Sequence, residues 1–229
     1  MPLQVIESKD PIASLIRLEK STVFELLFSL NVLYHPGKHG QWVEEARASL
    51  SPDFLRELDA VYKPYDDGFL FYELAIDTPD RNDVPGFFDY VRGLDAAMFV
   101  FYLVGRVVTP EEIEQTGFAP KQFDALLKAI PYDVMCTCLE LPFDAILDDV
   151  LGFRDRLVDL WEWYWDSFFH AEVERLAPHW DTAISDKKAV LAHEGGMALY
   201  EHVTGKTELM PPLPPEYPVE EVIFIPPVS

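Results

Sequence analysis

The residues of this sequence with the most chemical potential lie in one stretch of helical periodicity, Asp144 to Pro178. Two charged side chains, Arg154 and Glu172, interrupt its apolar face: at 100° per residue both project within about 20° of Trp161. They are 18 residues apart in the sequence, or about 27 Å along a helix, so they cannot pair with each other. Because a buried carboxylate is costly unless it is paired, we expect Glu172 either to form a structural ion pair or to line a polar site.

The predicted binding site consists of this carboxylate, the neighbouring aromatic residues and the arginine on the same face. Its members are Glu172, Trp161, Trp165, Phe168, Phe169 and Arg154. A carboxylate among aromatic rings suits a small-molecule effector, and it equally suits an acid or base of raised pKa. His170 projects to the opposite, charged face, where a histidine is ordinarily solvated.

The sequence carries no known catalytic signature. It contains no G-x-S-x-G, H-E-x-x-H, Walker A or G-x-G-x-x-G motif. The paired carboxylates Asp148-Asp149 fall mostly on the wet face, which indicates a solvated surface. Cys136 and Cys138 form a lone C-x-C without a histidine nearby, so we predict two core residues instead of a tetrahedral metal site. We therefore predict no catalytic residue, no metal and no cofactor.

The stretch from Asp144 to Pro178 is predicted to be one long helix that packs by a single face. An arc of roughly 140° collects its apolar side chains. These are Ile146, Leu147, Val150, Leu157, Trp161, Tyr164, Trp165, Phe168, Phe169 and Leu176. The opposite face holds Asp148, Asp155, Asp159, Trp163, Asp166 and His170. Because a large aromatic gains nothing on a wet face, we expect a second layer of helices, or a second copy of the chain, to cover Trp163.

Shorter helices are predicted before this stretch. A capping box, Thr22-Val-Phe-Glu25, opens a helix from Val23 to Leu33, and Gln41 to Leu50 is a second helical segment. A third helix begins with Ser51 at the N-cap and Pro52 at the first helical position.

The middle of the chain is predicted to be helical as well. Phe69 to Ile76 suits either a strand or a helical turn, and Asp83-Val-Pro85 begins an apolar helix that ends at Gly105 or Arg106. Thr109 to Leu127 scans like a helix-turn-helix motif, opened by a capping box. Its acidic flanks predict an ordinary pair of packed helices, since a DNA reader presents basic side chains to phosphates.

The C-terminal part changes character. Pro178 is predicted to break the long helix, and His179 to Thr204 to form two pieces separated by Gly195-Gly196. Residues 206–229 are predicted to be a proline-rich arm and a closing strand, Val219 to Ile225, and we expect this segment to link to a further C-terminal domain. An unpaired strand this apolar invites aggregation, so we expect it to pair with Leu3 to Ile6.

The predicted fold class is therefore mainly α, a multi-helix bundle with a small β-sheet formed by the terminal strands. We expect residues 1–229 to form a single helical domain, which 229 residues suffice to fill.

Charge and hydropathy exclude two classes of function. Forty acidic against eighteen basic residues give a net charge of −22, which should repel a phosphate backbone, so we expect no direct nucleic-acid binding by this chain. The longest uncharged apolar run, Ala96 to Gly105, is too short to span a membrane, and no secretory signal opens the chain. With two cysteines only, we expect a cytoplasmic protein.

The order of several features resembles a known family. A helix reading VFELLFSLNVLYHPGKHGQW from Val23 to Trp42, a tryptophan-rich helix leading to LAPHWDTAI, a Gly-Gly piece and an apolar strand ending in IPPVS are similar to an uncharacterised domain found upstream of ArsR-type winged-helix DNA-binding domains in bacterial transcriptional regulators. The resemblance spans about Val23 to Ser229 and carries over no catalytic residues.

In such regulators a winged helix follows the closing strand, and this sequence contains none. The chain is then either the sensory half of a longer regulator or a stand-alone relative that has lost DNA binding. We expect a regulatory domain that binds a small-molecule effector or forms a homodimer. The alternatives are a stand-alone interaction module, whose partner contacts Trp163, and an enzyme that uses a buried carboxylate such as Glu172.

Overall fold

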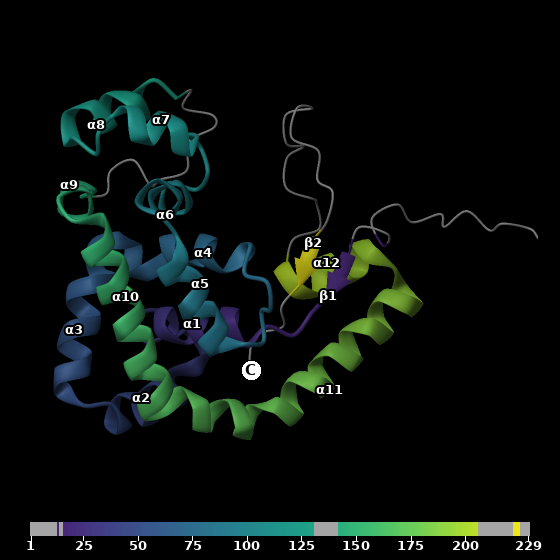
Figure 1. The fold of residues 1–229 in the computed structure, drawn as a ribbon. Coiled ribbons are helices and arrows are strands. Elements are labelled where there is room, and N and C mark those ends of the chain that lie inside the picture. Colours follow the sequence, from purple (N-terminus) through teal and green to yellow (C-terminus); the bar gives the residue numbers. More distant parts are fainter. Residues whose placement is uncertain (1–12, 14–15, 131–141, 206–221, 225–229) are drawn as a thin grey trace, which may run out of the picture. The chain divides into compact units, whose positions relative to one another are not determined.

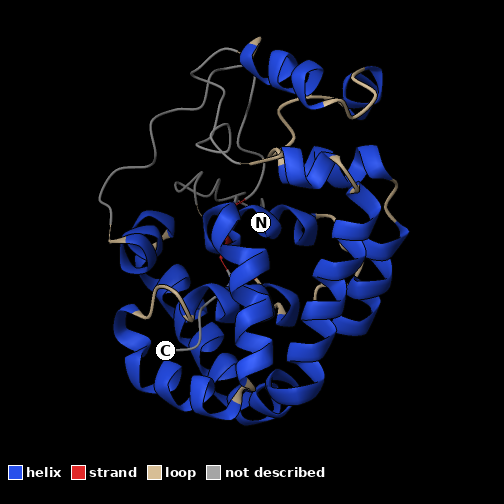
Figure 2. Cartoon of the chain, turned by 90° about the vertical axis from the view of Figure 1, so that its left-hand side faces the viewer, coloured by secondary structure: helices blue, strands red, loops and turns tan. Residues whose placement is uncertain are grey.

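A computed structural model of the chain describes residue 13 and residues 16–130, 142–205 and 222–224 (Figure 1). The described residues are mainly helical, which confirms the mainly α part of the predicted fold class (Figure 2). They divide into two compact units. The larger is Ser21–Glu174, and the smaller is drawn from Met1–Lys20 and Arg175–Val228. No helix among the described residues is long and apolar enough to cross a membrane.

The larger unit consists of α-helices joined by short 3-10 segments. In chain order its elements are α1 (Thr22–Val32), η1 (Gly37–His39), α2 (Gly40–Ser49), α3 (Pro52–Tyr62), η2 (Lys63–Tyr72), α4 (Glu73–Ile76), α5 (Val84–Gly93), α6 (Ala96–Leu103), α7 (Pro110–Gln115), α8 (Pro120–Lys128), α9 (Asp144–Leu147), α10 (Val150–Tyr164), the π-helical turn η4 (Trp165–Phe169) and the first turn of α11 (His170–Glu194).

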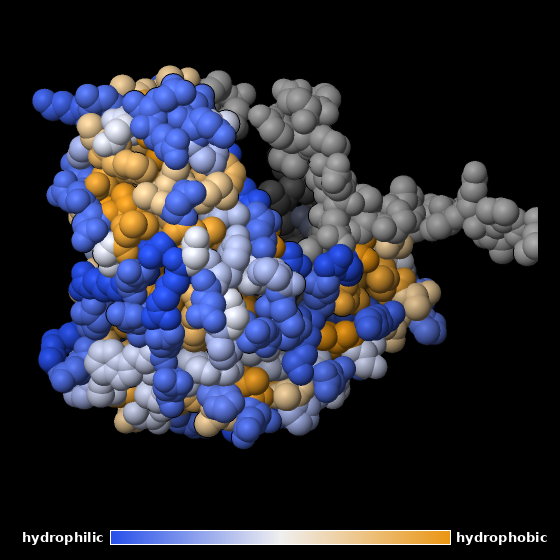
Figure 3. All heavy atoms as spheres, in the orientation of Figure 1, coloured by the Kyte–Doolittle hydropathy of each residue, from blue (hydrophilic) through white to orange (hydrophobic). Residues whose placement is uncertain are grey.

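Helix α10 is the centre of the larger unit. It packs against α3, α5 and α6 (Figure 1). Every residue of the predicted apolar stripe is buried or half-buried, and every residue predicted on the opposite face is exposed. That wet face contributes to the mainly hydrophilic surface over α10 and α3 in Figure 3. The helical period therefore predicts the orientation of the central helix correctly.

Helix α3 provides part of the cover predicted for Trp163. The Trp163 side chain is 40% exposed, and its ring meets that of Phe54 edge-on, with centroids 5.3 Å apart. Trp163 therefore lies at the border between the packed face and the wet face of α10.

The predicted single helix from Asp144 is interrupted. Asp149 leaves the helical conformation (φ −153°) and its carboxylate accepts a hydrogen bond from the Gly152 N–H at 3.0 Å. An aspartate that bonds the backbone in this way ends one helix and caps the next, which is why α9 and α10 are separate.

Pro178 does not break the helix, contrary to the prediction, because it lies inside α11. A proline in a helix interior removes a hydrogen bond and costs ~3 kcal/mol. Leu176 and Trp180, on either side of it, are both buried. Their burial offsets the cost of the proline and keeps this part of α11 helical.

Side-chain caps explain several of the other helix starts. Ser51 caps α3, and Thr109 and Glu112 form the predicted capping box of α7. Helix α1 is capped by Ser21, one residue before the predicted cap. The apolar helix predicted from Val84 to Gly105 is two helices, because the Asp95 carboxylate accepts from the Met98 N–H at 2.8 Å and starts α6.

The stretch Phe69 to Ile76, which the sequence allowed to be a strand or a helical turn, is helical. The segment before it contains a left-handed turn. Asp66, Asp67 and Gly68 all have positive φ, of 52°, 49° and 85°. At Gly68 a Cβ would lie 2.2 Å from the buried ring of Tyr62, so only glycine fits. This turn lets η2 fold back onto α3 and α1.

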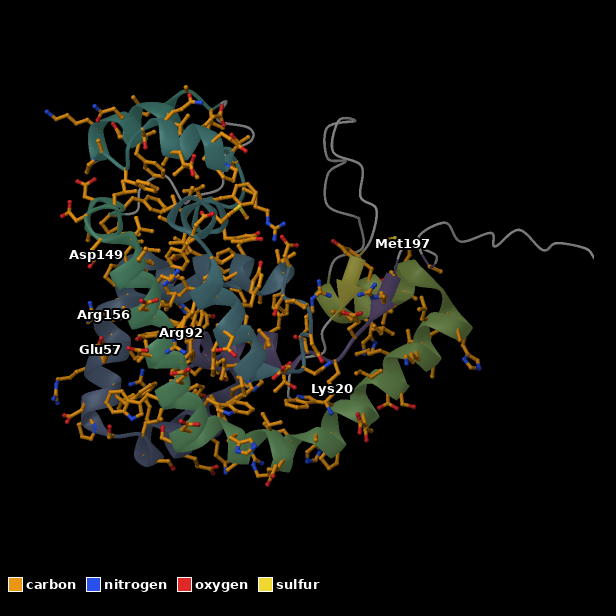
Figure 4. The ribbon with its side chains drawn as sticks, in the orientation of Figure 1. Lys20, Glu57, Arg92, Asp149, Arg156 and Met197 are labelled. Carbon is orange, nitrogen blue, oxygen red and sulfur yellow. The ribbon has the colours of Figure 1, made fainter. Side chains whose placement is uncertain are left out.

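Ion pairs clamp α10 to its neighbours (Figure 4). Arg156 donates to Glu57 of α3 at 2.6 Å. Arg92 of α5 donates to Asp159 at 2.6 Å and to Glu162 at 2.8 Å. The hydrogen bond from Arg92 lowers the pKa of Glu162, and the one from Arg156 lowers the pKa of Glu57.

The smaller unit contains the rest of α11, α12 (Gly196–Thr204) and two short strands, β1 (Ile16–Leu18) and β2 (Val222–Phe224). The Gly195-Gly196 break and the Gly205 stop fall where the sequence predicts them. The strands pair in parallel, with Arg17 opposite Ile223 (Figure 1). The predicted partner Leu3 to Ile6 lies outside the described residues, as do Cys136 and Cys138, and the partner observed for β2 is β1.

Candidate functional site

The π-helical turn η4 lies at the predicted binding residues. Trp165–Phe169 form this turn, and the His170 N–H bonds the Trp165 carbonyl five residues back. A π turn inserts an extra residue into the helix and is frequent at functional sites. It separates α10 from α11 and carries Trp165, Phe168 and Phe169, with Glu172 in the next turn.

Glu172 accepts a hydrogen bond from a distant part of the chain. The Trp42 Nε1–H donates to Glu172 Oε2 at 3.0 Å. Both side chains are half-buried. Helix α2, which carries Trp42, is held close to α1 because Arg47 donates to the Leu33 carbonyl at 2.8 Å. The indole N–H thus partly compensates the carboxylate that the sequence placed among aromatic rings.

Aromatic rings lie next to the Trp42 end of this hydrogen bond. The rings of Trp42 and Phe168 are 6.1 Å apart and inclined by 57°. Tyr164 lies next to Phe168 at 5.7 Å and stacks on Phe169 at 5.5 Å. We call Trp42, Phe168 and Glu172 the indole–carboxylate site, with Tyr164 and Phe169 as its buried floor.

The floor of the site is polar at one point. The Tyr164 and Ser29 hydroxyls are 3.0 Å apart, and both residues are buried. Burial raises the pKa of Tyr164, and the negative charge of Glu172 raises it further. Tyr164 therefore stays neutral beneath the carboxylate.

Trp165 contributes a ring beside the site. Its ring is inclined by 53° to that of Phe169, with centroids 6.4 Å apart, and lies 4.8 Å from the ring of His170. The His170 side chain is exposed, as expected for the charged face.

Trp161, a predicted site residue, lies in the core and not at this site. Its ring is fully buried, stacks on Phe87 at 5.3 Å and meets Phe71 at 6.2 Å. Its indole N–H donates to the Tyr62 hydroxyl at 2.7 Å. These contacts give Trp161 a packing role.

Arg154 also lies away from Glu172. Its guanidinium donates to the Leu94 carbonyl at the end of α5 and pairs with Asp155 at 2.7 Å. The side chain is 12% exposed. Arg154 thus fastens α10 to the α5–α6 connection, and the structure brings together only Trp165, Phe168, Phe169 and Glu172 of the predicted set.

Sequence reasoning missed two residues. Trp42 lies 130 residues from its partner Glu172, so no local pattern could connect them. Glu25 has the spacing of a capping-box residue, yet its side chain is buried on α1, only 5% exposed. Burial is the main cause of the raised pKa of Tyr72, and the negative charge of Glu25 raises that pKa further. The sequence offered one signal for Trp42, its place at the end of the segment VFELLFSLNVLYHPGKHGQW, on which the expected family resemblance partly rests.

The arrangement brings two half-buried rings and a carboxylate together. The neutral Tyr164 hydroxyl is buried against Ser29. Within the described ranges, no group of three or more His, Cys, Asp and Glu residues is arranged to hold a metal ion. Comparisons of the chain with protein-family models, with curated proteins and with solved structures found no match.

Proposed function

We propose that the chain is the effector-binding, regulatory part of a bacterial ArsR-like transcriptional regulator. The hydrogen bond between Trp42 and Glu172 carries this proposal, because it joins the segment of family resemblance to the predicted ligand residues. The π turn that carries Trp165, Phe168 and Phe169 supports a binding role, since such turns are frequent at functional sites. DNA recognition would belong to a winged helix following Ser229, and a cytoplasmic homodimer is part of the proposal.

The binding role is tested by a thermal-shift screen of neutral, anionic and cationic compounds. A true effector raises the melting temperature of the wild type and not that of Phe168→Leu, because a ligand that binds only the folded state stabilises it. Phe101→Leu, which alters a half-buried ring of α6, is the matched control and should respond like the wild type. If no compound shows this dependence on Phe168, the binding role is wrong.

The regulatory role is tested on the protein as encoded by its gene. If a winged helix follows Ser229, the protein should shift DNA from its own promoter region, and the effector should change that affinity. A reading frame that ends without a DNA-binding domain would overturn the regulator and leave only a stand-alone binding protein.

The small terminal sheet belongs to the same proposal. We propose that the pairing of β2 with β1 extends into a sheet that anchors the following domain. Deleting residues 219–229 should lower the melting temperature, because β1 loses its partner. An unchanged melting temperature would show that this pairing contributes nothing to stability.

A further inference from the structure

The π turn η4 changes which side of the helix faces the core. In an uninterrupted helix of about 100° per residue, Phe169 would project about 80° away from Trp161, and Val173 about 120° away. In the structure Phe169 is buried in the same core cluster as Trp161, and Val173 packs against that cluster. If one residue of the turn is left out of the count, Phe169 and Val173 both project within about 20° of Trp161. The turn therefore acts as one inserted residue.

Two ring contacts show the same shift. The rings of Tyr164 and Phe169 stack with centroids 5.5 Å apart, and the ring centroids of Trp165 and His170 are 4.8 Å apart. The members of each pair are five residues apart in the sequence. On a regular α-helix such side chains project about 140° from each other and cannot meet. The i to i−5 hydrogen bond of the π turn places them one above the other.

The residues that follow the turn depend on this shift. In an unbroken helix Phe168 would project where Phe169 lies, and Glu172 would project where Val173 packs. One phenylalanine can replace the other, whereas a carboxylate facing the core carries a large cost in free energy. The inserted residue thus keeps Val173 against the core and Glu172 beside Trp42.

The backbone hydrogen bonds at the start of the turn are irregular. The Trp165 N–H is shared between the carbonyls of Trp161 and Glu162. Ser167 is exposed, and its hydroxyl donates to the Trp163 carbonyl at 2.6 Å. A serine that bonds the backbone in this way competes with the regular hydrogen bonds of a helix. Exposed and irregular backbone bonding is typical of segments that open locally.

We propose that η4 is a conformational device: a one-residue insertion that keeps the packed faces of α10 and the first turn of α11 in phase, and that makes this turn the first to open between Val150 and Glu174. The device goes beyond the proposed function and needs no ligand.

Deleting Asp166 tests the device. Asp166 is exposed and contributes no ring to the packed face. Without it the chain can form a continuous α-helix in which Phe169, Glu172 and Val173 keep their places, so the melting temperature should equal or exceed that of the wild type. Native-state cleavage by chymotrypsin after the aromatic residues of the turn, located by mass spectrometry, should slow by about tenfold, because a regular turn opens less often.

Two controls separate the insertion from other effects. Asp166→Ala removes the same side chain and keeps the turn, so its melting temperature and cleavage rate should match those of the wild type. Deleting Asp155, an exposed residue in the regular part of α10, turns one end of that helix by about 100° relative to the other. Buried residues such as Leu157 then lose their place, and the melting temperature should fall by about 10 °C or more.

A lower melting temperature after deletion of Asp166 would overturn the proposal, because the π turn would then be required by the packing. Unchanged cleavage in the deletion variant, or equally slow cleavage in Asp166→Ala, would also overturn it, because the extra residue would not be what opens the helix. These results are independent of the thermal-shift screen, which tests the binding role through its dependence on Phe168.

Discussion

At the scale of a residue, the Tyr62 hydroxyl is expected to contribute to stability through its hydrogen bond with Trp161. The Tyr62 hydroxyl accepts the indole N–H of Trp161 at 2.7 Å, and both side chains are buried. In Tyr62→Phe the buried N–H loses its partner, so we expect the free energy of unfolding to fall by roughly 1–3 kcal/mol. Urea denaturation monitored by circular dichroism measures this loss.

Tyr164→Phe is the control for that prediction. Removing the Tyr164 hydroxyl leaves the Ser29 hydroxyl bonded to the Leu26 carbonyl at 2.7 Å, so the expected loss is smaller, about 0.5–1.5 kcal/mol. Equal losses in the two variants would show that the unpaired indole N–H is not what makes the Tyr62 hydroxyl important.

At the scale of an element, the left-handed turn before α4 depends on Gly68. In Gly68→Ala the new methyl meets the Tyr62 ring at 2.2 Å and the backbone keeps a φ of 85°. Gly105→Ala is the matched control, because Gly105 also has a positive φ, of 67°, but no atom lies within 4 Å of the point that its new methyl would occupy. We expect Gly68→Ala to lose roughly 1–3 kcal/mol more than Gly105→Ala.

The same denaturation experiment measures both glycine variants. If they lose the same free energy, the cost at Gly68 comes from backbone conformation alone, and the close approach of Tyr62 has no energetic effect.

Some features of the helices could be predicted from the sequence and others could not. The two faces of α10 were predictable because burial repeats with the helical period along the chain. The π turn at Trp165–Phe169 was not, since its i to i−5 bond breaks that period without a sequence signature. The Asp95 cap was missed because strong apolar residues on both sides of it resembled one helix.

The candidate site was only half predictable for a related reason. Phe168 and Glu172 share a short segment, so their proximity follows from helical spacing. Trp42 reaches Glu172 through tertiary packing of α2, which no local pattern encodes. Arg154 and Trp161 share the face of Glu172 but lie several turns earlier along the helix, where other elements occupy them.

At the scale of the whole molecule, the pKa shifts predict how stability depends on pH. The hydrogen bond from Arg92 holds the pKa of Glu162 below its ordinary 4.5. A carboxylate with a lowered folded-state pKa stabilises the protein above its unfolded-state pKa, and this contribution is lost as pH falls through the folded-state value. Arg92→Gln should therefore lower stability at neutral pH and have little effect at pH values below that range.

Because the Glu162 side chain is 40% exposed, the difference at neutral pH should be about 1 kcal/mol at most. Urea denaturation of wild type and Arg92→Gln between pH 7 and about pH 3 measures it. Arg56→Gln, which removes an exposed arginine whose ion pair with Asp53 lies within α3, is the control. A difference that stays constant as the pH falls would contradict the assignment to Glu162.

The charge of the whole chain predicts its behaviour toward nucleic acid. At a net charge of −22, the chain should show no binding to random duplex DNA in about 150 mM salt. Fluorescence anisotropy with a labelled duplex tests this expectation. Micromolar affinity under these conditions would show that local basic patches outweigh the total charge.

Pro178 gives α11 a mechanical property that its length conceals. Proline has no N–H, so the Glu174 carbonyl lacks its usual partner four residues on. The Thr182 hydroxyl donates to the Pro178 carbonyl at 3.0 Å, a bond that tends to bend helices. This turn of α11 is therefore held by fewer backbone hydrogen bonds than its neighbours, and we expect its amides to exchange hydrogen faster than those of the turns on either side.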